Sequence, residues 1–596
     1  VILTPDKDPF FGGTYFPARD GDRGARKGFL TILRELRAEY EANRGDIVAR
    51  AQQLSQRIEA ASTPSPPGNI PGAAAIEQAV RGAAASFDPS WGGFGQAPKF
   101  PRPVLLELLL RYQRRTGDQH ALEMVSVTLE RMAAGGMHDH VGGGFHRYST
   151  DARWLVPHFE KMLYDNAQLV PLYLEAYQAT GRERFAEVAR DTLRYVAREM
   201  TAAGGAFFSA TDADSRTPSG HEEEGYFFTW APSELKNVLS ADRVRTVSAY
   251  FGVTAAGNFE GRNILHTPQS DEAVARDLGV SAGELGQTIA DAREELYRAR
   301  TKRPPPHTDD KILTSWNGLM ISAFARAALV LGNEDHARRA ERAADFVLRA
   351  LRSKDGRLLR SFKDGRANHA GYLDDYAFLI QGLLDLYEAT ADGRRIEQAM
   401  SLQAILDRHF WDNGSGGYFM TSDSHERLFA RDKPTYDGAE PSGNSVALMN
   451  ALRLYELTTN DEYRARAEQA FAAFSRDLAR SPGASPKMLA ALEYYLDRPL
   501  EVFIVRPEPG ANAEPLLSRF RRTHLPNRVF TLTTEGEKLD ALSRLVPGLE
   551  GKRALRGNVT AFVCERGRCE LPTSEPAVFA RQLTKVHALP AAAPPR

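Results

Sequence analysis

A short turn recurs through the middle of the chain and separates one helical pattern from the next. Gly or Asn in such a turn can take the left-handed conformation that ends a helix, and an Asp or Asn beside it can cap the helix that follows. Three of the four spacings between successive copies are roughly 60 to 70 residues, a regularity typical of repeat architectures. The fourth, from Gly181 to Gly332, corresponds to one repeat plus an insertion of about 90 residues. The copies are Thr116-Gly117-Asp118, Thr180-Gly181-Arg182-Glu183, Leu331-Gly332-Asn333-Glu334-Asp335, Ala391-Asp392-Gly393 and Thr459-Asn460-Asp461-Glu462.

Two kinds of helical segment alternate around these turns. Segments before a turn are apolar, as in 319–325, and we expect inner helices; segments after a turn are rich in Arg, Glu and Ala, as in 183–200, and we expect outer helices with one solvated face. Six such pairs predict a mainly α fold, an (α/α)6 toroid over 73–498 with an insertion at about 202–312. The expected helices are 73–86, 102–116, 118–135, 158–180, 182–201, 315–331, 334–353, 373–390, 394–411, 443–458, 461–480 and 485–497.

The connections between these helices are asymmetric. Links from inner to outer helices are short turns, whereas links from outer to inner helices are long. Long loops in a compact domain are usually functional. In a ring they emerge on one face, together with the N-termini of the inner helices, which carry partial positive charge and free N–H groups. We therefore expect the functional site at this mouth of the toroid.

Smaller units are expected on both sides of the ring. Residues 1–61 suggest a hairpin (1–4 and 9–16) followed by a helix from 29 to 60, and 62–72 is a Pro- and Ser-rich linker. Residues 499–587 suggest a small α/β domain with strands at 500–506, 527–533 and 560–564, and residues 588–596 form a tail.

Composition excludes several classes of protein. A net charge of -1 argues against nucleic-acid or anionic-membrane partners, and we find no apolar run long enough to span a bilayer. No signal peptide is visible, so we expect a cytoplasmic protein, although Val1 suggests that the chain continues a longer one. The two cysteines, Cys564 and Cys569, are expected to be an unlinked pair of thiols without zinc, because their spacing lacks a second ligand pair.

Several long loops carry a Gly-Gly-aromatic element, and they are Gly92-Gly93-Phe94, Gly143-Gly144-Phe145, Gly204-Gly205-Ala206-Phe207 and Gly416-Gly417-Tyr418-Phe419. Glycines of this kind suit tight turns that place an aromatic ring beside a cleft, where sugars could stack. The alternative is that each element is a turn with a packing anchor.

The richest loop runs from His138 to Asn166 and holds four histidines, at 138, 140, 146 and 158. Pro157 favours a helix start, which would place His158, Lys161 and Asp165 on one helical face. His158 would then suit a general acid or base, because its unperturbed pKa lies near neutrality. The alternatives are polar loop packing or, for His138 and His140, metal ligation, for which a third ligand is not evident.

Other loop ends add polar groups at the expected mouth. Asp374 and Glu440 could serve as acid and base in glycoside chemistry. Asp, Ser and Asn at helix starts can equally be N-caps, and the run Glu222-Glu223-Glu224 is expected to be solvated. No P-loop, dinucleotide fingerprint, metalloprotease motif or nucleophile elbow is present in the sequence.

Five stretches resemble the YyaL-type, spermatogenesis-associated thioredoxin-domain family, and they are Phe10–Pro17, Gly92–Pro101, 142–169, Asp310–Gly318 and Gly438–Asn444. The resemblance implies a partial thioredoxin-like segment over 1–61, a toroid similar to N-acylglucosamine 2-epimerases, and a C-terminal α/β region. The Cys-x-x-Cys-type motif of the family belongs to a half of the thioredoxin domain that is absent here, so no dithiol activity is assigned.

The leading hypothesis is a sugar epimerase or isomerase in which mouth histidines move a proton beside a carbonyl, as in similar toroids, without cofactor or metal. Its catalytic candidates are His158, as the base, with His140, Asp374 and Glu440. The candidates for binding a sugar or oligosaccharide are Phe94, Lys99, His138, His146, Arg147, Trp154, Lys161, Asp165, Asn166, Asp212, Asp214, Trp316, Asn317, Asp375 and Asn444. The alternatives are a glycoside hydrolase or lyase with paired carboxylates, and a non-catalytic thioredoxin-linked scaffold.

Overall fold

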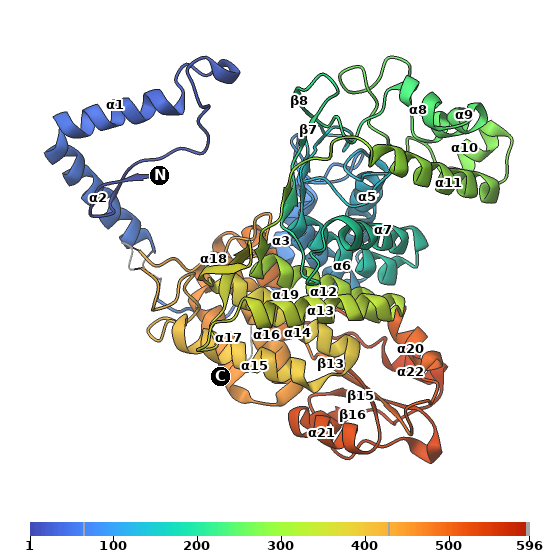
Figure 1. The fold of residues 1–596 in the computed structure, drawn as a ribbon. Helices are drawn as coiled ribbons and strands as arrows, with labels where there is room; N and C mark the ends of the chain where they lie inside the picture. Colours follow the sequence, from blue (N-terminus) through green and yellow to red (C-terminus); the bar gives the residue numbers. More distant parts are fainter. Residues whose placement is uncertain (63–65, 427–429, 592–596) are drawn as a thin grey trace.

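The computed structural model describes residues 1–62, 66–426 and 430–591 (Figure 1). Residues 63–65 of the expected linker and residues 592–596 of the expected tail lie outside these ranges.

Six inner helices form the centre of the molecule. Each packs against the next in chain order, and the last packs against the first, so the predicted toroid is confirmed. The inner helices are α4 (Pro103–Thr116), α6 (Leu163–Thr180), α12 (Thr314–Leu331), α14 (Leu373–Thr390), α16 (Gly443–Thr458) and α19 (Pro486–Leu496). Contacts between their first turns, described below, bring the inner N-termini together at one mouth.

Outer helices surround this ring, and they are α3 (Ala73–Ser86), α5 (Gln119–Ala134), α7 (Glu183–Glu199), α13 (Glu334–Ala350), α15 (Gly393–His409) and α17 (Asp461–Ala473). The short turns work as the sequence predicts. Gly181 ends α6 at φ 71°, and the side chains of Asn333 and Asp392 cap the helices that follow them. The expected helix 461–480 is divided, because α17 ends at Ala473 and α18 (Ser475–Arg480) follows.

The Gly-Gly-aromatic elements are turns with buried anchors, so the expectation that their rings face a cleft is wrong. Phe145, Phe207 and Tyr418 are at most 1% exposed. Each forms a β-bridge to the segment that follows an outer helix, in the pairs His138–Phe145, Thr201–Phe207 and Trp411–Tyr418. Phe94, which was a candidate for sugar binding, is buried in the same way and bridges to Phe87.

An asparagine near the start of an inner helix holds each of three anchors by both backbone groups. Asn317 accepts a hydrogen bond from the Phe207 N–H (2.8 Å) and donates to the Phe207 carbonyl (3.0 Å). Asn166 does the same for Phe145, and Asn444 for Tyr418. These three asparagines were sugar-binding candidates, but their amides are used to fasten the loops to the ring.

The insertion between α7 and α12 forms a separate lobe beside α7 (Figure 1), with its own apolar cluster around Trp230, Leu235 and Leu296. Its helices are α8 (Pro232–Val238), α9 (Ala241–Tyr250), α10 (Asp271–Leu278) and α11 (Ala282–Arg300). Short strands line the mouth loops, and they are β3 (Tyr148–Ser149), β4 (Pro157–His158), β5 (Lys161–Met162), β6 (Ala210–Thr211), β7 (Asp214–Arg216), β8 (Glu222–Glu224), β9 (Thr308–Asp309), β10 (Ile312–Leu313), β11 (Leu359–Lys363) and β12 (Arg366–Ala370).

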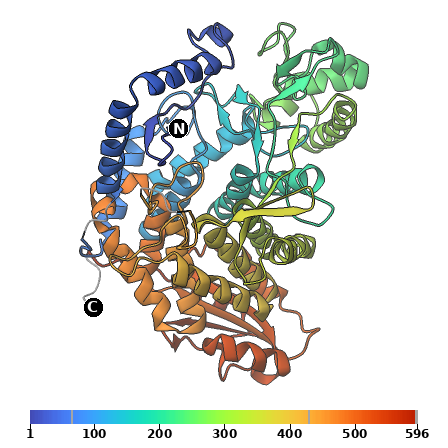
Figure 2. The same cartoon turned by 60° about the vertical axis from the view of Figure 1, so that its left-hand side comes forward.

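The N-terminal segment extends away from the ring as an arch (Figure 2). It contains the expected hairpin, β1 (Ile2–Leu3) and β2 (Pro9–Phe11). The single helix expected from 29 to 60 is instead two helices, α1 (Phe29–Ala42) and α2 (Arg44–Ser62), because Asn43 leaves the helical conformation at φ -126° and ψ 35°.

The C-terminal region is a four-stranded sheet in the order β14-β13-β15-β16, with β13 and β14 parallel. Its elements are β13 (Leu500–Arg506), α20 (Glu514–Arg521), β14 (Arg528–Thr534), α21 (Glu537–Leu545), β15 (Thr560–Glu565), β16 (Arg568–Cys569) and α22 (Pro576–Gln582).

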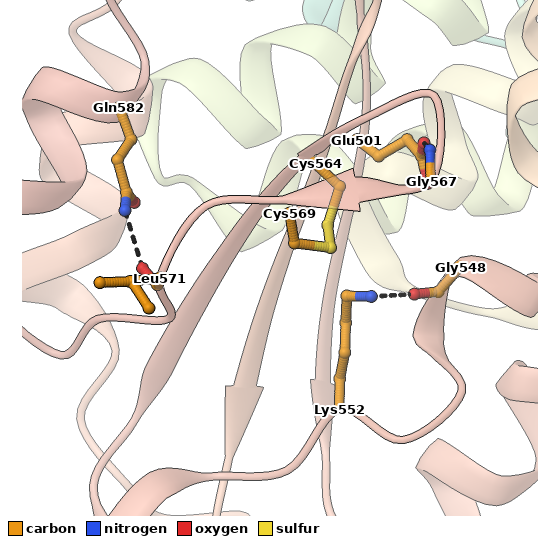
Figure 3. Close-up of a disulfide and its surroundings, with 8 residues drawn as sticks. All are labelled: Glu501, Gly548, Lys552, Cys564, Gly567, Cys569, Leu571 and Gln582. Atoms are coloured by element: carbon orange, nitrogen blue, oxygen red, sulfur yellow. Dashed lines mark hydrogen bonds between the residues drawn. A yellow bond between two sulfur atoms is a disulfide. The ribbon is translucent and has the colours of Figure 1, made fainter.

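The two cysteines are joined by a disulfide, so the prediction of unlinked thiols is wrong (Figure 3). The turn between β15 and β16 has Arg566 and Gly567 at positive φ, 49° and 75°, which is the conformation of a two-residue hairpin turn. This turn places Cys564 directly opposite Cys569, with their Cα atoms 3.9 Å apart. The four-residue spacing is therefore a hairpin signal, although it is not a zinc motif.

The C-terminal sheet docks on the ring at the end opposite the mouth. Tyr387 of α14 hydrogen-bonds Thr531 of β14 at 2.6 Å, and Glu388 binds both Arg453 of α16 and Arg528 of β14 at 3.1 Å. Ion pairs also fill the ring's axis, including Glu107–Lys487 at 2.7 Å, and leave a cavity of about 40 Å³ among the inner helices. Among the described helices, none has the length and apolar character needed to cross a lipid bilayer.

Candidate functional site at the mouth of the ring

The mouth is built from the first turns of the inner helices and the loop before α16. Trp316 of α12 donates its indole N–H to a Glu440 carboxylate oxygen at 2.8 Å, and its ring meets that of Tyr164 of α6 edge to face, with centroids 4.9 Å apart. Asp374 of α14 lies against Gly443 of α16. These contacts join the N-termini of four inner helices. The sequence predicted that these N-termini lie on one face, but it did not predict which side chains touch.

Several carboxyl groups at this mouth have raised pKa values, among them Glu440, Asp374 and Asp165. Burial raises the pKa of Glu440 to about 7, and burial with the nearby carboxylates Asp375 and Glu440 raises that of Asp374 to about 7. Burial also raises the pKa of Asp165 well above its usual range. One oxygen of Asp165 and one of Asp374 have no hydrogen-bond partner within the described ranges. At neutral pH Asp374 and Glu440 can exist in either protonation state, as acid–base chemistry requires.

His158 is also at the rim, but its role differs from the one expected. It lies in β4 and not in a helix, because α6 begins only at Leu163, so His158, Lys161 and Asp165 do not share a helical face. Its ring nitrogens contact Glu160 (3.1 Å) and Glu224 (2.7 Å). The hydrogen bonds with Glu160 and Glu224 raise the pKa of His158 to about 9. A histidine that is protonated at neutral pH cannot serve there as the base.

Several rim residues were missed by the sequence analysis. Phe100, 45% exposed, stacks on Tyr148 with ring centroids 4.9 Å apart, and Tyr148 in turn meets the His158 ring at 5.2 Å. Glu224 is exposed as expected for a solvated run, yet it also pairs with His158. Arg147, which was anticipated, binds Glu160 at 2.9 Å. The aromatic and charged residues of these loops are visible in the sequence. Their pairing is not, because partners such as His158 and Glu224 are up to 66 residues apart in the chain.

Asp375 is a structural residue at the start of α14. Its carboxylate is fully buried and accepts hydrogen bonds from the backbone N–H groups of Ser315 (3.0 Å) and Tyr372 (2.9 Å). The carboxylate therefore fastens α12 to α14, and it also contacts Arg360 of β11 at 3.4 Å.

Four further binding candidates are buried supports of the loops. Lys99 is paired with Asp88 at 2.6 Å, and the Trp154 indole donates to the Trp91 carbonyl at 2.9 Å. Lys161 bonds Asp139 at 2.7 Å, and His146 bonds the Phe159 carbonyl at 2.8 Å, while burial lowers the pKa of His146 to about 3. Because all four side chains are at most 1% exposed, the expectation that they touch substrate is wrong.

The remaining candidates lie in the insertion or against it. Asp212 follows β6 and accepts a hydrogen bond from the Ala213 N–H at 2.7 Å. Asp214 begins β7 and lies opposite Glu224 of β8, which contacts His158 at the rim. His138 and His140 are buried between α7 and the insertion, 5.1 Å apart, and burial lowers the pKa of both. His140 is therefore removed from the catalytic candidates of the mouth.

Two family models match parts of the chain. Residues 1–59 match a DsbH-type thioredoxin-like family model described as a protein of unknown function, DUF255, and residues 303–490 match the N-acylglucosamine 2-epimerase model. Over 613 residues the chain is 37% identical to spermatogenesis-associated protein 20 of Homo sapiens, covering 97% of this chain and 78% of that protein. It is 34% identical over 600 residues to uncharacterized protein B0495.5 of Caenorhabditis elegans, covering 95% and 81%.

Among solved structures, cellobiose 2-epimerase from Bacillus thermoamylovorans B4167 aligns at 10% identity with a TM-score of 0.43, covering 67% of this chain and 86% of that one. Fold and mouth define the class: a six-hairpin toroid of the kind matched by the epimerase model, preceded by a thioredoxin-like segment. The chain belongs to the spermatogenesis-associated protein 20 family, as the sequence resemblance indicated.

Proposed function

We propose that the mouth is a carbohydrate-active site of the epimerase or isomerase type, in which Asp374 and Glu440 exchange protons with a sugar. The observation that carries this proposal is the pair of carboxyl groups, both with a pKa of about 7, beside the Trp316 ring. The region that matches the N-acylglucosamine 2-epimerase model, 303–490, contains all three residues and does not contain His158.

In this proposal one carboxylate removes the proton from the carbon next to the carbonyl of an open-chain sugar. The electron pair moves onto the carbonyl oxygen and forms an enediolate, and the other carboxyl group returns a proton to the carbon from the opposite face. A base and an acid with pKa values near the working pH are well suited to such a step. Trp316, which packs edge to face against the buried Tyr164, offers aromatic surface for the sugar. The cationic His158 holds Glu160 and Glu224 at the rim.

Proton NMR in D₂O tests this directly. The chain is incubated with N-acetylglucosamine, N-acetylmannosamine, glucose, mannose or cellobiose, and we expect deuterium at C2 together with signals of the epimer or isomer. Glu440→Gln and Asp374→Asn should each lower the exchange rate at least about 10²-fold, because general acid–base groups typically contribute that much. Glu397→Gln, an exposed position on α15, is the control. Exchange at the same rate in all three variants would contradict the proposal.

A glycoside hydrolase is the second candidate, because two carboxyl groups at one mouth are also what glycoside hydrolysis requires. The same samples distinguish the two activities. Release of a new reducing end from an aryl glycoside or oligosaccharide, without deuterium at C2 of the free sugar, would favour hydrolysis. Saturable sugar binding without either reaction would favour a binding scaffold.

A further inference from the structure

A second cavity lies on the outside of the ring, between α7 and the insertion. Its volume is about 390 Å³, within the range of about 300–1,000 Å³ that is usual for small-molecule sites. Its walls come from the His138–His140 loop, from α7, from the end of α9 and from α11. No residue of the acid–base pair at the mouth lines it.

The polar side of this cavity is rich in arginine. Arg184, Arg190 and Arg194 of α7 and Arg293 of α11 line it, against two carboxylates, Glu187 and Asp191. Burial has the largest effect on the pKa of His138 and lowers it; Asp191 raises this pKa, and Arg293 and Arg184 lower it by smaller amounts. The four arginines pair with three carboxylates, Glu183, Glu187 and Asp191. Guanidinium groups bind the oxygens of phosphates and carboxylates in pairs.

One buried donor at the cavity lacks a partner. The Nε atom of Arg293 is buried and has no hydrogen-bond partner in the described part of the chain, although its Nη2 atom binds Asp191 at 2.8 Å. His138 is 4% exposed and its Nε2 atom lies 3.2 Å from Asp191, so in the neutral ring Nδ1 is an acceptor. Buried polar groups are nearly always satisfied, so unpaired ones beside a cavity point to a missing ligand.

The opposite wall is apolar and aromatic. Tyr250 and Phe251 at the end of α9, with Ile289 of α11 and Val188 of α7, are at most 9% exposed and face the same cavity. We propose that this cavity binds a small phosphate ester, with the phosphate against the arginines and the apolar body of the ester against Tyr250 and Phe251. A phosphate monoester carries about -1.5 to -2 charges at neutral pH. The four arginines exceed by one the three carboxylates that pair with them, Glu183, Glu187 and Asp191.

The test uses phenyl phosphate as the probe, because it has both the charge and a flat apolar body and is not a sugar. Isothermal titration calorimetry of the full chain should show saturable binding of phenyl phosphate, weaker binding of inorganic phosphate, and none of phenol. Arg184→Gln with Arg190→Gln should weaken binding of phenyl phosphate at least about tenfold. Both side chains are about half exposed, at 51% and 47%, so the double variant is expected to fold.

Two controls separate this site from the mouth. Arg338→Gln on the outer helix α13, 55% exposed, should leave binding unchanged, and so should Glu440→Gln. Absence of saturable phenyl phosphate binding at millimolar concentrations would overturn the proposal. Equal affinities for phenyl phosphate and inorganic phosphate, or loss of binding in Glu440→Gln with retention in the double variant, would overturn it as well. None of these outcomes depends on whether the mouth turns over a sugar.

Discussion

At the scale of single residues, Asp374 and Glu440 determine how the proposed activity should depend on pH. One must be ionised as the base while the other is protonated as the acid, and both pKa values are about 7. The profile of kcat/KM should therefore be bell-shaped with its maximum near pH 7, and its limbs belong to the coupled pair and not to either residue.

The same profile assigns a role to His158. Because the pKa of His158 is about 9, His158 stays protonated over the pH range near 7 in which Asp374 and Glu440 titrate. His158→Gln should therefore leave both limbs of the kcat/KM profile at the same pH. A limb that disappears in this variant would instead make His158 the titrating base. The measurement is the deuterium exchange rate of wild type and variant between pH 5 and 10.

Glu440 should also make stability depend on pH. Its pKa rises from 4.5 in the unfolded chain to about 7 in the folded chain, so the folded state binds the proton more tightly. Stability is therefore lost as pH rises from about 4.5 to 7, since the unfolded state ionises first.

Glu440→Gln removes this penalty, because the amide stays neutral and its oxygen can still accept the Trp316 hydrogen bond. We expect it to stabilise the protein by about 3 kcal/mol at pH 8, and hardly at all at pH 4. Urea denaturation at the two pH values measures the difference. An equal effect at both pH values would show that Glu440 does not titrate near 7.

At the scale of elements, the asparagines that hold the loop anchors should matter more than ordinary helix caps. Asn317→Ala leaves the N–H and carbonyl groups of Phe207 unpaired in the core, and each buried unsatisfied group costs about 1–3 kcal/mol. Asn333→Ala removes an exposed cap of α13 and should cost about 1 kcal/mol. Differential scanning fluorimetry should show the larger fall in melting temperature for Asn317→Ala, and the reverse order would contradict this role.

The sequence predicted the ring well because its signals are local. Apolar periodicity and the caps at Gly181 or Asn333 depend on neighbours within one or two turns, and the expected segment 373–390 coincides with α14. His158 was misplaced because its strand is set by pairing with Tyr148 in a distant part of the same loop.

The site was harder to predict than the ring for the same reason. A buried residue that supports a loop, such as Asn317, and an exposed residue at the rim can be of the same amino-acid type. Only their tertiary contacts show which of the two roles each one has. Asp374, Glu440 and Trp316 were named from their places at loop ends, but their contacts and protonation depend on burial, which a single sequence does not reveal.

At the scale of the whole molecule, Glu388 connects the ring to the C-terminal sheet through Arg453 and Arg528. Glu388→Gln leaves the buried guanidinium of Arg528 without its carboxylate, whereas Arg453 keeps Asp385 at 2.8 Å. Breaking a buried pair on one side typically costs about 3–5 kcal/mol. Adding Arg528→Met removes the uncompensated charge and should recover part of this loss. Urea denaturation of both single variants and the double variant measures the coupling, and purely additive losses would show that the pair is not coupled.

The docked sheet and the ion pairs along the axis leave the ring with one open end. If the mouth is the carbohydrate site proposed above, a sugar would enter and leave on that one face, and a polysaccharide could not pass along the axis of the ring.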